Sequence, residues 1–174
     1  MSKYDNIDKE KALTIITKVE QNSKAMDEIV NEIIFKYVDD LDKYVAHIDS
    51  RLCDKGNPPT DAELDKFCLN LSSLIYFASG MSEQLGIRDD VAKATYKEMY
   101  NTTRDSAEKG TVQDKNTLAE LASQQEQLIS ICYTRAYRIV KAKVDSAQEL
   151  LASIKKVISR RMQEQQLTNI SGGR

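Results

Sequence analysis

The chain has 174 residues, of which 41% are apolar, 30% are charged and 6% are aromatic, with six glycines, two prolines and no tryptophan. This composition is typical of proteins built from long helices and argues against a sheet protein. Residues 130–174 carry nine Lys or Arg and three Asp or Glu, a net charge of +6, whereas residues 1–129 carry 16 and 24, a net charge of −8. Such asymmetry predicts either binding to a polyanion or electrostatic assembly between copies.

The N-terminal region, residues 1–56, is predicted to be helical and acidic. A short helix is expected over residues 8–20, followed by a soft break or helix cap at Asn22. A longer helix is expected over residues 26–52, because apolar residues recur there every three or four positions and aspartates fall between them. The Gly-Asn-Pro-Pro run at residues 56–59 ends that helix, since proline cannot continue it.

A helical core is expected over residues 60–167. Its first helix begins with a capping-box pattern, in which Thr60 and Glu63 each satisfy a free backbone N–H group. We expect this helix to end at Gly86, and Asp89 to cap a shorter helix that leads into a polar loop.

The last helix is predicted to run without interruption from Thr117 to about Gln166, a stretch without Gly or Pro. At about 1.5 Å per residue it would be ~75 Å long, too long for a compact domain of this size to enclose. We therefore expect an elongated all-α protein whose C-terminal helix buries its apolar stripe between copies in a homo-oligomer. The residues assigned to this oligomerisation stripe are Leu128, Cys132, Ile139, Ala147, Leu150, Ile154 and Val157. Residues 168–174 are expected to be disordered.

Nothing in the sequence indicates catalysis. The only histidine, His47, has no partner histidine, and the three cysteines are interpreted as buried or half-buried apolar side chains, because they lack the spacing of a metal site. The common nucleotide-binding and zinc-protease motifs are absent. We therefore predict a protein that is not an enzyme and needs no cofactor or metal. No apolar run approaches the ~18 residues of a membrane span, so a cytoplasmic protein without a membrane partner is expected.

Basic residues of the last helix gather on one face. On a helical wheel most of them lie opposite the apolar stripe, and only Asp145 and Glu149 dilute that face. A row of cations suits a phosphate backbone and predicts salt-sensitive nucleic-acid binding, with Tyr133 and Tyr137 available to stack on unpaired bases. The alternative is a solvated coiled-coil surface, or one that pairs with the acidic second helix of a neighbouring copy. The candidate binding residues are Arg135, Arg138, Lys141, Lys155, Lys156, Arg160 and, inside the apolar arc, Arg161.

A second cluster of basic and aromatic residues precedes the polar loop. It interleaves Lys93, Lys97 and Arg104 with Tyr96 and Tyr100. Such residues suit a single strand, but two tyrosines four positions apart also fit a helix core. Lys93, Lys97, Tyr100 and Arg104 are therefore candidate nucleic-acid contacts, and at least one of the two tyrosines is expected in the core.

Two pieces of sequence, Ala94–Tyr100 before the loop and Ala152–Arg161 near the end, stand in an arrangement that resembles the UvsY-type recombination mediator proteins of large tailed phages. The resemblance covers about residues 69–164 and implies a small ring-like homo-oligomer, assembled through its C-terminal helix, that binds single-stranded DNA. It also implies a partner recombinase of the RecA type and displacement of a single-strand-binding protein. The family's DNA contacts would fall on Lys93, Lys97 and Tyr100.

The chain departs from the family pattern at Glu98, which lies amid the basic patch, and in its additional acidic region before residue 60. The competing interpretation is a helical structural or adaptor protein, such as a phage assembly component, that does not bind nucleic acid. A third is an effector of one host protein. A mediator is expected to bind single strands with an affinity that falls steeply as salt rises, whereas an adaptor is not.

Overall fold

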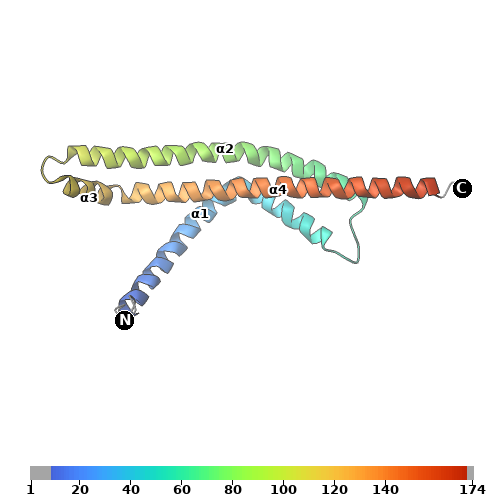
Figure 1. The fold of residues 1–174 in the computed structure, drawn as a ribbon, viewed down its shortest axis with the longest axis horizontal. Coiled ribbons are helices and arrows are strands. Elements are labelled where there is room, and N and C mark those ends of the chain that lie inside the picture. Colours follow the sequence, from blue (N-terminus) through green and yellow to red (C-terminus); the bar gives the residue numbers. More distant parts are fainter. Residues whose placement is uncertain (1–8, 172–174) are drawn as a thin grey trace, which may run out of the picture.

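Four helices and no strand make up residues 9–171, the part of the chain that the computed structural model describes. They are α1 (Lys9–Leu52), α2 (Asp61–Ser106), α3 (Val112–Ala122) and α4 (Gln124–Ser171). Helices α2 and α4 run antiparallel side by side, α3 lies in line with α4 near the end of α2, and α1 approaches α4 from one side and bends where it meets α4 (Figure 1). The predicted elongated, all-α architecture is confirmed.

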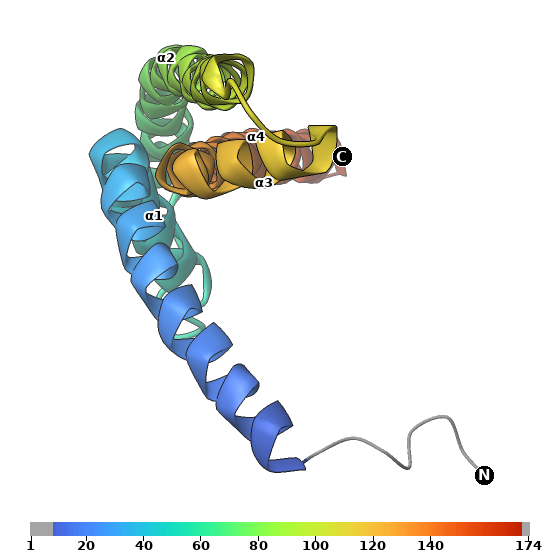
Figure 2. The ribbon, with the colours of Figure 1, turned by 90° about the vertical axis from the view of Figure 1, so that its left-hand side faces the viewer.

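Helix α1 is one continuous helix, so the predicted break at Asn22 is wrong. No glycine or proline lies between Lys9 and Leu52, and a polar residue such as asparagine costs only a few tenths of a kcal/mol inside a helix. The C-terminal half of α1 packs on α2 and α4, whereas its N-terminal half projects away from them (Figure 2). The predicted end of the helix near Leu52 is confirmed.

The core lies where the C-terminal half of α1 meets α2 and α4. Its fully buried side chains include Ile48 of α1, Leu71 and Leu85 of α2, and Val140 of α4. One apolar cluster therefore joins all three long helices. The boundary predicted between residues 56 and 60 is a loop between helices that share this core.

Helix α2 is also longer than predicted, because it continues through Gly86 and Asp89 to Ser106. Gly86 allows a close approach of α4, since a Cβ at this position would lie 3.2 Å from a ring carbon of Tyr137. Asp89 is not a helix cap but a buried side chain in the middle of α2. The glycine therefore serves packing between helices and does not end one.

The predicted capping box at the start of α2 is confirmed. The Thr60 backbone N–H donates to Glu63 Oε2 at 2.9 Å, and the Glu63 backbone N–H donates to Thr60 Oγ1 at 3.3 Å. Arg51 of α1 also donates to Glu63 Oε1, at 2.9 Å. Hydrogen bonds from the Thr60 backbone N–H, from Arg51 and from the Thr60 hydroxyl together lower the pKa of Glu63 from 4.5 to about 2. The ionised carboxylate thus connects α1 to the first turn of α2.

We expect Glu63→Gln to lower the melting temperature at neutral pH and to lose this effect in acid. Because the pKa of Glu63 is lowered on folding, its ionised form stabilises the protein fully above the unfolded-state pKa of about 4.5, and this contribution disappears as pH falls toward about 2. Circular dichroism melts of both proteins at a series of pH values would show a difference that shrinks across that window. Glu83→Gln, at an exposed position of α2, is the control, and a constant difference down to pH 2 would contradict the assignment.

The predicted final helix is divided into two at Ser123. The Ser123 backbone departs from helical geometry, with φ −102° and ψ 12°, while its N–H and hydroxyl both donate to the Ala119 carbonyl, at 3.1 and 2.7 Å. A serine side chain that bonds the preceding turn competes with the helical hydrogen-bond pattern. Helix α4 then extends to Ser171, so residues 168–171, expected to be disordered, are helical, while residues 172–174 of that predicted tail lie outside the described residues.

Helix α3 begins at a capping box that was not predicted from the sequence. Thr111 and Asp114 exchange hydrogen bonds, from the Thr111 backbone N–H at 2.9 Å and from the Asp114 backbone N–H at 3.2 Å. Gly110 precedes them with a φ of 118°, a conformation that favours glycine. The polar loop is consequently short, and α3 starts five residues before Thr117.

Candidate nucleic-acid interface

Helix α4 carries a row of exposed cations, which we name the α4 basic row. Its members are Arg135, Arg138, Lys141, Lys155 and Lys156. None of the five forms a salt bridge with a carboxylate of the described residues. From Arg135 to Lys156 the row extends for about 32 Å along the helix axis. Asp145 and Glu149 lie between its two ends and separate it into two groups.

Two further basic residues near the end of α4 have partners within the chain. Arg160 pairs with Glu164 one turn later, at 2.9 Å, and stays exposed. Arg161 donates from Nη1 to the Pro59 carbonyl and to Asp61 Oδ1, both at 2.9 Å. The prediction of Arg161 as a nucleic-acid contact is therefore corrected, because its charge is neutralised where it attaches the α1–α2 loop to α4.

One contact within the chain agrees in kind with the alternative interpretation, in which the last helix pairs with an acidic helix. Lys143 of α4 pairs with Asp42 of the acidic part of α1, at 2.6 Å. This lysine lies at the edge of the helix interface and not on the α4 basic row. An acidic helix therefore meets α4, but it leaves the exposed cations uncovered.

The second predicted cluster lies on the last turns of α2, beside α3, at the opposite end of the hairpin from the C-terminal half of α4 (Figure 1). Lys93 pairs with Asp89 at 2.6 Å, and Arg104 pairs with Asp105 at 3.1 Å. Lys97 is exposed, and Tyr100 is half-buried with its ring centroid 6.4 Å from that of Tyr96. The structure therefore does not bring the two predicted clusters into one compact patch.

A buried aspartate links α2 to α4 beside this second cluster. Asp89, which is 3% exposed, accepts a hydrogen bond from Thr134 Oγ1 at 2.6 Å and the ion pair from Lys93. The sequence contained a signal for it, since Leu85, Asp89 and Ala92 follow the spacing of a buried helix face. Lys93 consequently has a structural partner that competes with a phosphate.

The predicted oligomerisation stripe is largely used inside one chain. Its more buried members are Cys132, Ala147 and Ile154, covered by α1 and α2, and Leu150, which packs against the same core. Its exposed members are Leu128, Ile139 and Val157. An apolar stripe needs a cover, and here the cover is supplied by the chain itself. The first four residues thus serve the core in place of the predicted contact between copies.

Aromatic side chains are also placed differently from the prediction. Tyr133 and Tyr137 are half-buried and pack against the core, so they are not free stacking platforms. Exposed rings are Phe35 of α1 and Tyr76 and Phe77 of α2, and the last two contact each other edge to face with centroids 5.5 Å apart. Their exposure was not predicted, although Ile75, Tyr76 and Phe77 in succession cannot all share one face of a helix.

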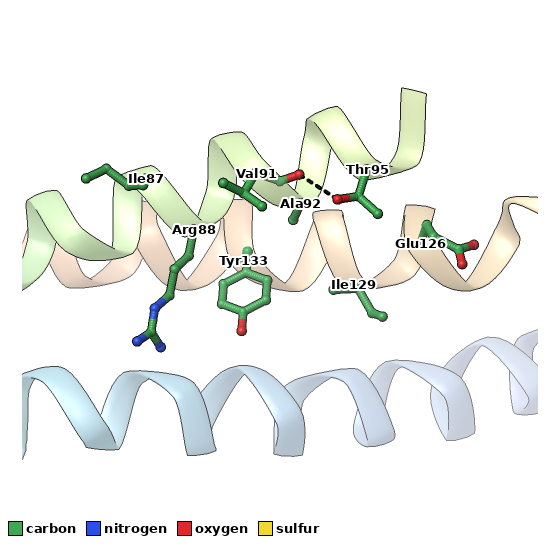
Figure 3. A pocket seen from close by; sticks show the side chains of 8 residues that line it. All are labelled: Ile87, Arg88, Val91, Ala92, Thr95, Glu126, Ile129 and Tyr133. Carbon is green, nitrogen blue, oxygen red and sulfur yellow. Dashed lines mark hydrogen bonds between the residues drawn. The ribbon is translucent and has the colours of Figure 1, made fainter. Parts of the chain in front are cut away.

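A pocket between α2 and α4, on the side that faces α1, is lined by both charged and apolar side chains (Figure 3). Ile87, Val91 and Ile129 line it, together with the charged residues Arg88 and Glu126. Arg88 points toward α1 and away from Glu126, and its guanidinium lies 5.8 Å from the Tyr37 ring centroid. The two charged groups therefore do not form a pair across the pocket.

The cysteines of the described residues are unpaired: Cys132 is buried, Cys68 is half-buried and Cys53 is exposed. The prediction of buried or half-buried cysteines is correct for the first two and wrong for Cys53. Burial raises the pKa of Cys132 and of Cys68, which keeps both thiols protonated. Residues 9–171 contain no group of three or more metal-binding side chains and no helix long and apolar enough to cross a membrane.

No protein-family model, curated protein sequence or solved structure matches the chain.

Proposed function

We propose that this chain is a non-enzymatic protein that binds single-stranded nucleic acid along the α4 basic row. The observation that supports this proposal most is that five cations on one helix, in two groups, are exposed and unpaired with any described residue, although the chain as a whole has a net charge of −2. Charged groups elsewhere on the long helices, such as Lys93 and Arg161, have partners within the chain. The row is therefore the best available polyanion site.

The physical basis of this binding is the release of counterions from the phosphates. Each phosphate neutralised on a single strand contributes about −0.7 to the slope of log affinity against log salt, so five contacts give about −3.5. Affinity then falls about 100-fold between roughly 50 and 200 mM salt. Long, flexible lysine and arginine side chains follow the backbone and do not read bases, so no sequence preference is expected.

The resemblance to the UvsY-type family extends the proposal to recombination. In this role the chain presents single-stranded DNA to a RecA-like recombinase and assists the displacement of a single-strand-binding protein. Several copies on one strand would add their weak sites, because each bound copy raises the effective concentration of the next. The α4 basic row, and not the α2 cluster, is proposed as the main contact.

A helical adaptor is the second candidate function, and one observation favours it. The projecting half of α1 exposes apolar residues, among them Leu13, Ile15 and Val19, each more than half exposed. An exposed apolar surface of this kind is typical of a binding site for another protein. An adaptor of this kind uses α1 and leaves the α4 basic row as an ordinary solvated face.

Fluorescence anisotropy of a labelled oligothymidine, titrated with protein at several salt concentrations, tests the proposal. We expect binding whose affinity falls about 100-fold between roughly 50 and 200 mM salt. Changing all five members of the α4 basic row to glutamine should remove this binding at the lowest salt. Circular dichroism checks that the variant remains folded, which is expected because all five side chains are exposed.

A control variant with the same change in net charge separates a local site from a general charge effect. It carries glutamine at five other lysines: Lys36, Lys55, Lys66, Lys109 and Lys115. Binding should survive in this control, and glutamine at Lys93 and Lys97 should weaken it only slightly. Failure of the wild-type protein to bind at about 50 mM salt, or equal loss in the control, contradicts the proposal and favours the adaptor.

A further inference from the structure

The projecting half of α1 carries a second apolar stripe, which meets the one that α1 buries against α2 and α4 only at its C-terminal end. We call it the α1 seam; its positions alternate strictly between three and four residues: Ala12, Ile15, Val19, Asn22, Met26, Ile29 and Ile33. Ile15, Val19 and Ile29 are 61%, 60% and 50% exposed. A strict three-and-four repeat is the pattern by which one helix packs along another in a coiled coil. Met26 and Ile33 also pack against the core, whereas the exposed positions of the seam form a helix-pairing surface that no helix of the described residues covers.

The C-terminal half of the α1 seam lines an apolar groove. This groove, of about 610 Å³, lies between α1 and α4 and includes Met26, Ile29 and Ile33 on one side and Leu128 and Tyr133 on the other. Beyond it α1 diverges from the rest of the molecule (Figure 2). The adjoining pocket on the α2 side shares Tyr133 with it (Figure 3). Diverging helices thus leave an apolar space that a further helix could occupy.

The charges along this part of α1 indicate which helix would occupy the groove. Residues 9–18 carry three lysines and one glutamate, whereas residues 20–32 carry one lysine and four acidic residues. In a parallel pair, the basic segments of the two copies face each other, as do the acidic ones, and both pairings are repulsive. In an antiparallel pair, the basic segment of one copy faces the acidic segment of the other, and the two attract. An antiparallel pair also places the exposed Ile15 and Val19 of one copy over the groove of the other, where the acidic residues lie.

We infer that two copies of this chain associate through antiparallel α1 seams, each copy's residues 12–19 lying in the groove beside Met26 and Ile29 of the other. The contact is symmetric, so it closes as a dimer and does not grow into a filament. Asn22 lies near the centre, and a single polar residue in an apolar seam sets register and orientation. This dimer does not require nucleic acid, so it stands or fails separately from the proposed function.

Light scattering coupled to gel filtration, without nucleic acid, gives the first test. The wild-type protein should have the mass of a dimer at tens of micromolar. Ile15→Asp combined with Val19→Asp should give a monomer with unchanged helical content, because neither residue is in the core of one chain. Leu69→Asp with Leu167→Asp is the matched control, since both leucines are exposed elsewhere, and it should remain a dimer. A monomeric wild-type protein, or a dimeric seam variant, overturns the inference.

Cross-linking tests the antiparallel register. In a background with Cys53→Ser and Cys68→Ser, Cys132 being buried, Ser23→Cys should form a covalent dimer with a short bismaleimide, because Ser23 is exposed, follows Asn22 directly and flanks the seam on the helical wheel. Lys11→Cys, which also flanks the seam, should not, because antiparallel seams centred near Asn22 separate the two copies of residue 11 by about 30 Å along the axis. The background alone is the control. Cross-linking at both positions indicates parallel helices, and at neither position excludes the seam; either result overturns the inference.

Discussion

Replacing Leu71 by alanine is expected to lower the free energy of unfolding by about 3–4 kcal/mol. Leu71 is 0% exposed and belongs to the core cluster shared by α1, α2 and α4. The cost has two parts, the lost burial of the side chain and the cavity that remains because three helices cannot all close around it. Urea denaturation followed by circular dichroism measures the change.

Leu69→Ala is the matched control for this prediction. Leu69 lies two residues away on the same helix and is 73% exposed. Its replacement should change the free energy of unfolding by less than about 0.5 kcal/mol, because an exposed substitution leaves no cavity. Similar losses in the two variants would mean that Leu71 does not lie in the core that joins α1 to the hairpin.

Asp89→Ala is expected to lower the free energy of unfolding by about 2–3 kcal/mol, because it leaves the Thr134 hydroxyl without its buried acceptor and Lys93 without its ion pair. Asp89→Asn keeps an acceptor for Thr134 and should cost less. Denaturation in urea measures both variants, and Asp90→Ala at the neighbouring exposed position is the control.

A double-mutant cycle shows whether the loss comes from the contact between α2 and α4. Thr134→Val removes the other partner of the 2.6 Å hydrogen bond. If the two side chains act together, the double variant should lose less unfolding free energy than the two single variants lose in sum, by at least about 0.5 kcal/mol. Additive losses would show that Asp89 stabilises α2 alone.

Strong local signals in the sequence predicted the helix boundaries well, and weak ones did not. The Gly-Asn-Pro-Pro run and the Thr60 capping box mark a real loop and a real helix start. Asn22 costs only a few tenths of a kcal/mol inside a helix, and the cost of about 1 kcal/mol at Gly86 is overridden by the close packing of α2 on Tyr137 of α4. At Ser123 the backbone leaves helical geometry although its side chain makes the same hydrogen bond as Ser153 and Ser159 inside α4, so no residue pattern marks this end of α3.

The exposed face of α4 could be predicted because a helical wheel needs only the helix itself. The fate of its apolar stripe could not, since periodicity shows that a face is covered and does not show which helix covers it. For the same reason the partners of Arg161 and Lys143 were not predicted. Asp61 and Asp42 lie about 100 residues away in the sequence, and only the antiparallel hairpin and the crossing of α1 bring them close.

The continuity of α1 through Asn22 has a mechanical consequence. No loop separates its free and packed halves, so the free half is joined by continuous helix to an inner half that Val30, Leu41 and Ile48 fix in the core, and α1 bends where it meets α4 (Figure 1). A partner bound to the N-terminal half of α1 is therefore connected to the core by a helix and not by a flexible loop.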